Sequence, residues 1–431
     1  MSFGDSILHT ASIAAWASAA VTIPDHTILR AAVQAAPQAA YNTRIHPDAS
    51  QLALVLSGGG ARAAYQVGVL RLLAREFPDL VPGILTGVSA GGINAAYLAC
   101  RQEPYAEKIE RLAEVWGDLR IDDVFRVDLR DLASRTLRWG GRLLSAGKSP
   151  LPPAKSLVDT APLRELLERL LSADGGMIGG IDESLRRGWL QSIALTASSY
   201  TTGQSITWVQ ARPDGRIQTT WERPQRKSTA CSLRVDHVMA SSALPFFFPA
   251  IDVDGAWYGD GGIRLTAPLS PAVHLGARRI IAVSTRYSRS RMEADRPLIA
   301  GYPPPAQVAG VLFNAIFLDL LDQDALHMQQ INELVARLPE GSRDGLRHID
   351  LLVIRPSEDL GRLANAYEPE LPRGFRFLTR GLGTRETRSN DMLSLVMFQR
   401  DYVRHLMEMG EADAAARLPE IRQFVSAPEP S

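Results

Sequence analysis

The sequence predicts an α/β fold built around a mainly parallel β-sheet. Residues 52–75 and residues 84–100 both follow the order of apolar strand, glycine turn and helix. The run Leu52–Leu56 is apolar at every position, as is typical of a parallel strand buried on both faces. Two further apolar runs, 279–285 and 349–354, are expected to be strands. Strands separated by helices in this way favour a parallel sheet.

Composition limits the classes of function. The chain has 431 residues, of which 45% are hydrophobic and 22% charged, as in an ordinary globular protein. Lys plus Arg balance Asp plus Glu at 47 each, so no overall field attracts nucleic acid, and we expect no nucleic-acid partner. Cys100 and Cys231 match no metal or redox spacing. We expect two reduced core thiols, no metal site and a cytoplasmic location.

Three parts are expected along the chain. Residues 1–50 form an N-terminal helical arm, whose apolar run 13–23 follows no Lys or Arg, ends at Pro24 and is too short to span a bilayer. We expect this arm to lie on the body or on a membrane; a cleaved signal peptide is the alternative. Residues 51–286 form the main domain. Residues 287–425 form a helical extension that adds the strand 349–354 to the same body.

A serine stands in a short glycine motif between the strand at 84–86 and the helix that follows. The motif is Gly87-x-Ser89-x-Gly91. A sharp strand-to-helix turn leaves no room for side chains two positions on either side of the serine, so glycine is required there. The turn also places the hydroxyl at a helix N-terminus, where amide groups favour negative charge. The alternative is a glycine-rich turn with a structural serine.

A second glycine turn follows the first strand. Gly58, Gly59 and Gly60 are succeeded by Ala61 and Arg62. Successive glycines can present backbone N–H groups to an oxyanion without obstruction by side chains. A dinucleotide site is the rival, but it needs an acid that ends the next strand, whereas Asp79 precedes that strand. Arg62 is expected to anchor the loop, to contact an anionic substrate or to be a solvated surface residue.

The base that would activate the serine is expected to be an aspartate. An apparent hairpin over 252–258 leads into Asp260-Gly261-Gly262, where flanking glycines can aim a carboxylate on a tight turn. The alternative is an Asx-turn aspartate. No histidine lies in a catalytic motif. The residues therefore suggest a Ser89–Asp260 dyad, with a triad that includes His348 as the alternative.

Two stretches are candidates for contact with apolar molecules. Residues 124–148 carry six basic residues against two acidic ones, interleaved with leucines and Trp139. They suit a lipid interface, or a lid helix with a solvated basic face. Phe246–Phe248 lies between two prolines and suggests a pocket wall for acyl chains or a core segment. Residues 212–232 are expected to be a loop, and 307–337 and 390–409 to be helical.

Four motifs together resemble the patatin-like phospholipases: Gly58–Arg62, Gly87–Gly91, Ala240–Pro245 and Asp260–Gly262. The resemblance covers about residues 52–285. It implies a three-layer α/β/α fold and hydrolysis of lipid acyl esters without cofactor or metal. It also implies that Ser89 is the nucleophile, Asp260 the proton acceptor, and Gly58, Gly59, Gly60, Ala61 and Arg62 the oxyanion site. The chain has Ala63 and Ala64 where the family usually has glycine. Its C-terminal part, with residues 354–357, looks like the extension of bacterial members.

Rival functions remain open from the sequence. One is an α/β-hydrolase esterase or an acyltransferase with a Ser89–Asp260–His348 triad. Another is a lipid-binding protein without turnover. The expected partner in each case is a phospholipid or another acyl-ester lipid, with peripheral contact to a membrane as a further expectation.

Overall fold

The computed structural model describes residues 51–126, 156–213, 217–299, 301–317, 320–343, 345–381 and 383–426. The chain divides into two compact units, Met1–Asn42 and Thr43–Ser431, and all described residues belong to the second. The N-terminal arm and nearly all of the basic segment 124–148 lie outside the described residues.

The described part contains a ten-stranded sheet. Five neighbouring strands are parallel, in the order β10 (Asp350–Ile354) at one edge, β9 (Arg279–Val283), β1 (Leu52–Leu56), β2 (Ile84–Val88) and β3 (Ser192–Ser199). The sheet continues with β4 (Ser205–Ala211), which is antiparallel to β3. It ends with β6 (Arg226–Ala230), which is parallel to β4, and β5 (Glu222–Arg223), which is antiparallel to β6. A hairpin of β7 (Ile251–Val253) and β8 (Ala256–Asp260) pairs with the end of β3.

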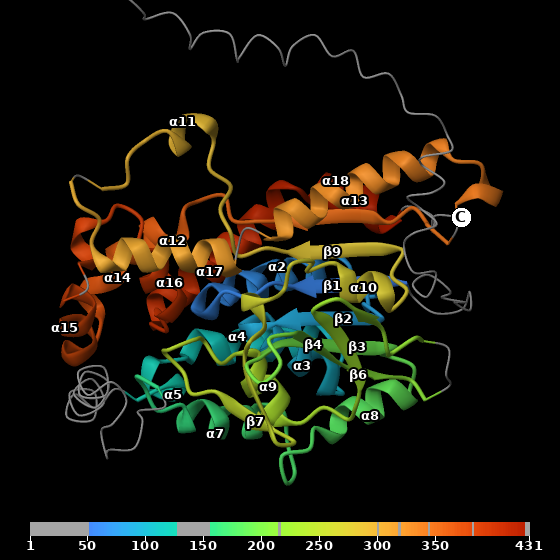
Figure 1. The fold of residues 1–431 in the computed structure, drawn as a ribbon, viewed down its shortest axis with the longest axis horizontal. Coiled ribbons are helices and arrows are strands. Elements are labelled where there is room, and N and C mark those ends of the chain that lie inside the picture. The colour runs from blue at the N-terminus through green and yellow to red at the C-terminus, as the bar shows by residue number, and fades with distance from the viewer. Residues whose placement is uncertain are drawn as a thin grey trace, which may run out of the picture. The chain divides into compact units, whose positions relative to one another are not determined.

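Helices cover both faces of the sheet, as Figure 1 shows. Alternate residues of β1 enter two separate cores: Leu52, Leu54 and Leu56 enter the larger one, and Ala53 and Val55 the smaller. The larger core includes α2 (Ala64–Glu76), α3 (Ser89–Cys100), α4 (Tyr105–Asp118) and α17 (Arg400–Ala416). The smaller one includes α10 (Ser270–His274) and α13 (Leu320–Arg337). The predicted α/β fold with a mainly parallel sheet and three layers is confirmed.

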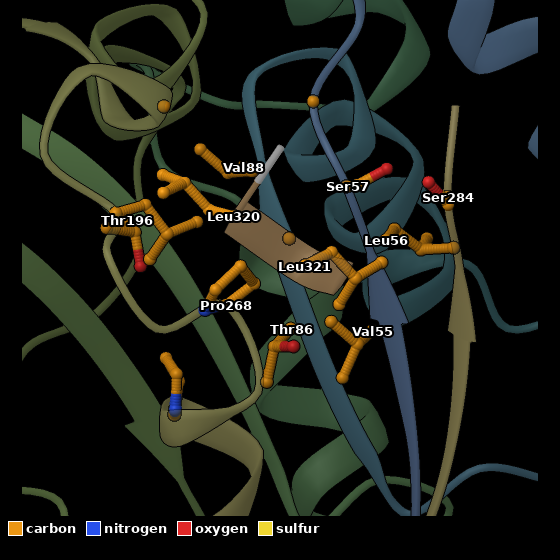
Figure 2. Close-up of a pocket in the computed structure, with 15 residues that line it drawn as sticks. Val55, Leu56, Ser57, Thr86, Val88, Thr196, Pro268, Ser284, Leu320 and Leu321 are labelled. Atoms are coloured by element: carbon orange, nitrogen blue, oxygen red, sulfur yellow. The ribbon is translucent and has the colours of Figure 1, made fainter. Parts of the chain in front are cut away.

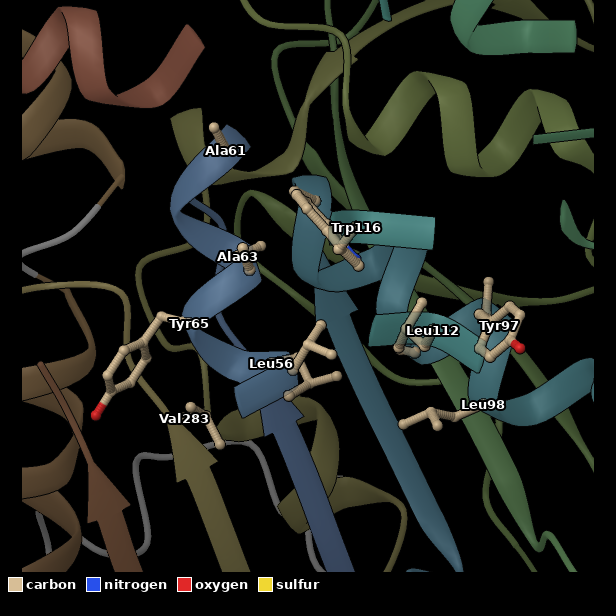
Figure 3. Close-up of a cluster of buried hydrophobic side chains, with 14 of the residues drawn as sticks. Leu56, Ala61, Ala63, Tyr65, Tyr97, Leu98, Leu112, Trp116 and Val283 are labelled. Atoms are coloured by element: carbon tan, nitrogen blue, oxygen red, sulfur yellow. The ribbon is translucent and has the colours of Figure 1, made fainter. Parts of the chain in front are cut away.

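Helix α17 packs tightly on α2 through two glycines. A Cβ added to Gly68 would lie 1.9 Å from the Met407 carbonyl oxygen, and one on Gly410 would lie 2.1 Å from that of Tyr65. Neither position can carry a side chain at this separation. The Tyr65 ring is fully buried in the same core, to which Leu56 and Val283 also belong (Figure 3). The C-terminal residues are therefore built into the body that holds β1.

The structure differs from the predicted elements in two places. Residues 212–232 contain β5 and β6, and short strands of polar residues resemble loops in sequence. The helix expected over 390–409 is divided into α16 (Asp391–Val396) and α17. The stretch 307–337 is helical, as predicted, and contains α12 (Pro305–Phe317) and α13. The remaining helices of eight or more residues are α7 (Ala161–Leu170), α8 (Gly179–Arg186), α14 (Leu360–Tyr367), α15 (Arg373–Gly381) and α18 (Leu418–Ser426). The short ones are α5 (Ile121–Val124), α9 (Val235–Ser241) and α11 (Arg291–Ala294).

One helical stretch of the described chain, residues 305–337, is long and apolar enough to cross a membrane when judged by length and composition alone. About a fifth of its most apolar window (21%) is buried in the protein.

Candidate active site

Ser89 lies in a strained turn between β2 and α3. Its φ is +53°, in the left-handed region that only glycine adopts easily. A Cβ on Gly87 would lie 2.6 Å from the Gly91 carbonyl oxygen, and one on Gly91 would lie 2.4 Å from the Leu56 and Ser57 oxygens. The turn therefore needs both glycines, for the reason that the motif predicts, and it is the geometry of a nucleophile elbow.

Asp260 is brought to the same end of the sheet by strand pairing. Thr196 on β3 pairs with Val88, the residue before Ser89, and Ala197 pairs with Asp260. The turn after Asp260 presses on these strands, because a Cβ on Gly261 would lie 2.1 Å from the Thr196 carbonyl oxygen. The structure thus places Ser89 and Asp260, which are far apart in sequence, beside each other.

The Asp260 carboxyl is fully buried and only partly hydrogen-bonded. Its Oδ1 accepts a hydrogen bond of 2.9 Å from the Gly262 amide. Its Oδ2 has no partner at hydrogen-bond geometry among the described residues. Burial raises the pKa of Asp260 to about 7, and interaction with the Ser89 hydroxyl and the Gly262 amide opposes this rise. A carboxyl with this pKa can accept a proton near neutral pH.

The glycine loop lies directly against the serine. A Cβ on Gly58 would lie 3.1 Å from Ser89 Cβ. Within the described chain, the amide N–H groups of Gly58 and Gly59 have no acceptor, so both can donate to a bound oxygen. Thr285 Oγ1 fixes the loop by donating to the Gly58 carbonyl at 2.5 Å. Gly60 has φ +55°, and a Cβ there would lie 2.0 Å from the Leu395 carbonyl oxygen.

The Arg62 side chain is buried and turned toward the C-terminal helices. Only 2% of the residue is exposed, so the expectation of a solvated surface arginine is wrong. Its Nε donates to Ser394 Oγ at 2.7 Å, and its Nη2 donates to Asp391 Oδ1 at 2.7 Å. Arg62 therefore anchors the glycine loop on α16. This favours the first of the three roles expected for Arg62.

Sequence reasoning missed a positioning residue, Ser241 at the end of α9. Its Oγ accepts a 3.0 Å hydrogen bond from the Ser89 amide and donates a 2.7 Å bond to the Thr196 carbonyl oxygen. The same segment holds the aspartate, since the Asp260 amide donates to the Ala243 carbonyl at 2.9 Å. The motif Ala240–Pro245 was the available signal, and its role is to position both Ser89 and Asp260.

The histidine alternatives do not fit the geometry. His348 precedes β10 at the amino end of the strand, whereas Ser89 follows the carboxyl end of β2. The His348 Nε2 lies 3.1 Å from Asp350 Oδ1, in an exposed pair. His274 stacks on Trp221, and burial lowers its pKa to about 4. The triad hypothesis with His348 is therefore wrong.

The aromatic segment after Pro245 is mainly a core element. Phe247 and Phe248 pack against Phe125, with ring centroids 5.1 and 5.9 Å apart. Phe246 is 75% exposed and has φ +63°. Of the two expectations for this segment, the core segment fits the structure better than the pocket wall.

A small cavity of about 30 Å³ adjoins the site (Figure 2). Gly58, Val88, Gly262, Leu320 and Leu321 are among its lining residues. It has room for about one water molecule. The described residues show no group of three or more His, Cys, Asp or Glu side chains that could hold a metal ion.

Residues 54–273, more than half of the chain, match the sequence model of the patatin-like phospholipases. The chain belongs to the patatin-like phospholipase family. The match includes the serine elbow, the glycine loop and the Asp260 turn, so the family assignment and the geometry concern the same residues.

Two fungal relatives match short parts of this patatin-like chain. Triacylglycerol lipase ptl2 of Schizosaccharomyces pombe is 49% identical over 49 residues, which are 11% of this chain and 8% of that protein. A patatin-like phospholipase domain-containing protein of Pyricularia oryzae is 38% identical over 66 residues, which are 15% of this chain and 8% of the relative. The chain thus matches only a small part of either relative.

Solved structures share a partial likeness. Human GIVD cytosolic phospholipase A2, in complex with methyl γ-linolenyl fluorophosphonate, superposes with a TM-score of 0.41 and 14% identity over 87% of this chain and 59% of that one. VipD from Legionella pneumophila gives 0.31 and 14% identity, over 84% and 67%. Both TM-scores are low, so the fold of this chain is argued from its own strand order and not from these structures.

Proposed function

We propose that this patatin-like chain is a serine lipid acyl hydrolase that cleaves fatty-acyl esters through a Ser89–Asp260 dyad. The observation that carries the proposal is the buried Asp260 carboxyl, with a pKa near 7 and a free Oδ2, placed beside the hydroxyl of a nucleophile elbow. A pocket that only binds lipid needs neither a strained serine nor a buried carboxylate.

The first half of the reaction forms an acyl-enzyme. Ser89 Oγ attacks the ester carbonyl carbon while its proton passes to Asp260 Oδ2. The amides of Gly58 and Gly59 donate to the oxyanion, and loss of one such donor typically raises the barrier by ~3 kcal/mol. The intermediate then collapses, the ester bond to the alcohol breaks, and the alcohol leaves with the proton from Asp260.

The second half releases the fatty acid. Water attacks the acyl carbonyl carbon and gives a proton to Asp260. The bond between the acyl group and Ser89 breaks, and Ser89 Oγ takes back that proton. Each step uses only side chains and backbone amides of the chain and water.

The finer assignments belong to the same proposal. We propose activity of the phospholipase A or lysophospholipase type, because the family match covers the whole proposed dyad. The sequence of the C-terminal extension supports a place among the bacterial members. A cytoplasmic location with association at membranes is proposed from the two unpaired cysteines and the lipid substrate.

The test is acyl release from phospholipid vesicles and from a soluble p-nitrophenyl ester by wild type, Ser89→Ala and Asp260→Asn. Both variants are expected to lose at least a hundredfold in kcat, while circular dichroism shows them folded. His348→Ala is the control and keeps wild-type activity. Product analysis with an added alcohol separates hydrolysis from acyl transfer.

Two results would contradict the proposal. One is Asp260→Asn with near wild-type activity, which would remove the base. The other is a wild-type protein that cleaves no ester and does not react with a fluorophosphonate.

A further inference from the structure

Helix α12 exposes apolar side chains and turns its two polar ones toward the protein, unlike an ordinary surface helix, although Phe313 also packs against the larger core. The whole helix, residues 305–317, contains no charged residue. Its outer face carries Val308, Val311 and Leu312, which are 47%, 56% and 57% exposed. These residues recur at the spacing of one helical face.

The polar side chains of α12 face the protein instead. Thr387 Oγ1 donates to Gln307 Oε1, and Asn314 Nδ2 donates to Asp391 Oδ2. A surface helix gains stability by burying its apolar side chains, so an exposed apolar face of this kind indicates an apolar partner. The hydrogen bonds hold α12 on the body, which suits a helix that lies on a bilayer rather than one that crosses it.

Helix α12 lies close to the catalytic groups. α12 lies beside α16 in Figure 1, and it also packs against the turn that follows Asp260. Asp391 on α16 accepts hydrogen bonds from Asn314 of α12 and from Arg62 of the glycine loop. Helix α12 is therefore linked through Asp391 to the proposed oxyanion site, where a lipid ester has to enter.

Positive charge lies next to the start of α12. The segment that follows α15, residues 383–388, contains Arg385, Glu386 and Arg388, a net charge of +1. This segment runs beside the start of α12: a Cβ on Gly383 would lie 2.5 Å from Pro304 Cβ, and the Arg388 amide donates to the Leu298 carbonyl at 3.0 Å. Arg385 and Arg388 are exposed. An apolar face with arginines at its border is complementary to a bilayer that contains anionic phospholipid.

We propose that the outer face of α12 docks the protein on an anionic phospholipid bilayer and presents the active site to it. Val308, Val311 and Leu312 enter the acyl region, and the arginines of 385–388 meet the headgroups. The proposal rests on the proposed function only in that the lipid substrate is drawn from the same bilayer.

The test uses flotation with vesicles of phosphatidylcholine containing phosphatidylglycerol. Binding is measured in the Ser89→Ala background, so that turnover does not alter the vesicles. Adding Val311→Glu and Leu312→Glu together is expected to weaken binding by at least about tenfold, because each change removes apolar burial and opposes entry of a charge. The control is Val81→Glu, a 43% exposed valine that precedes β2 at the amino edge of the sheet; this control keeps wild-type binding.

Activity separates this proposal from the proposed function. With the active Ser89 retained, the α12 double variant is expected to hydrolyse phospholipid vesicles more slowly than wild type, by the same factor as its loss of vesicle binding. Its rate on the soluble monomeric ester is expected to stay within about twofold of wild type. Equal binding by the variant and wild type, or no binding by wild type, would overturn the docking proposal. The docking proposal would also be overturned if light scattering showed that wild type is a dimer, that the double variant is a monomer, and that neither binds vesicles. The face would then be a contact between two copies of the chain. Vesicle binding without hydrolysis of any ester would contradict the proposed function and leave the docking face supported.

Discussion

Replacing Asp260 with asparagine should stabilise the fold increasingly as pH rises. The Asp260 carboxyl has an unperturbed pKa of 3.8, and burial raises it to about 7 in the folded protein. Between these values the folded protein holds a proton that the unfolded chain has lost, so the free energy of unfolding falls as pH rises from about 4 to about 7. Asparagine cannot ionise and removes this penalty.

The magnitude follows from the pKa difference. One pKa unit is worth about 1.4 kcal/mol, so the penalty in wild type reaches on the order of 4 kcal/mol above pH 7. The asparagine amide, placed where Oδ2 has no partner, costs about 1–3 kcal/mol at every pH. The free energy of unfolding of Asp260→Asn minus that of wild type should therefore grow by up to about 4 kcal/mol between pH 4 and pH 8, whatever its value at pH 4.

Urea unfolding from pH 4 to pH 8 measures this difference directly, since the other titrating groups cancel between the two proteins. Asp79→Asn changes an exposed aspartate and gives the size of an ordinary substitution. A difference that stays constant, or shrinks as pH rises, would refute the desolvated carboxyl and with it the proposed base. A growing difference combined with lost activity would be a trade-off between stability and function.

Three other predictions concern the same site. The kcat/KM for a soluble ester should rise with pH and level off above an apparent pKa near 7, because Asp260 acts as a base only when ionised; a flat profile from pH 5 to pH 8 would argue against it. Ser241→Ala leaves two buried backbone groups without their partner. It should lower the free energy of unfolding by about 1–3 kcal/mol for each group, and it should also lower kcat. Ser242→Ala removes a buried hydroxyl that has no partner among the described residues and should be nearly neutral; equal effects of the two would contradict the positioning role. Gly60→Ala should unfold the loop or abolish activity, since its φ is +55° and its Cβ meets a carbonyl at 2.0 Å. By contrast, Gly175→Ala, at φ +53° with open space around it, should cost only about 1 kcal/mol and spare activity.

The parts of the site that the sequence could predict are those fixed by local backbone geometry. Gly87 and Gly91 are required by the clearance around Ser89, and that requirement is visible within five residues of sequence. The apolar run of β1 likewise reports its own burial on both faces. The strands β5 and β6 were missed because they are short and nearly all of their residues are polar, which is the composition of a loop.

The parts that the sequence could not predict depend on contacts between distant segments. Arg62 and Asp391 are 329 positions apart, and nothing near either residue indicates that they pair. Ser241 is 152 positions from Ser89, so its motif signalled importance without showing what it contacts. His348 stands near an apolar strand in sequence, but the parallel register puts it at the edge of the sheet away from Ser89.

The most direct measurement is the site and rate of labelling by a fluorophosphonate, followed by intact-mass and peptide mass spectrometry. We predict a single adduct on Ser89, absent from Ser89→Ala and formed at least a hundredfold more slowly in Asp260→Asn, since the serine then lacks its base. Labelling of Asp260→Asn at the wild-type rate, or an adduct on another residue that persists in Ser89→Ala, would contradict the Ser89–Asp260 dyad.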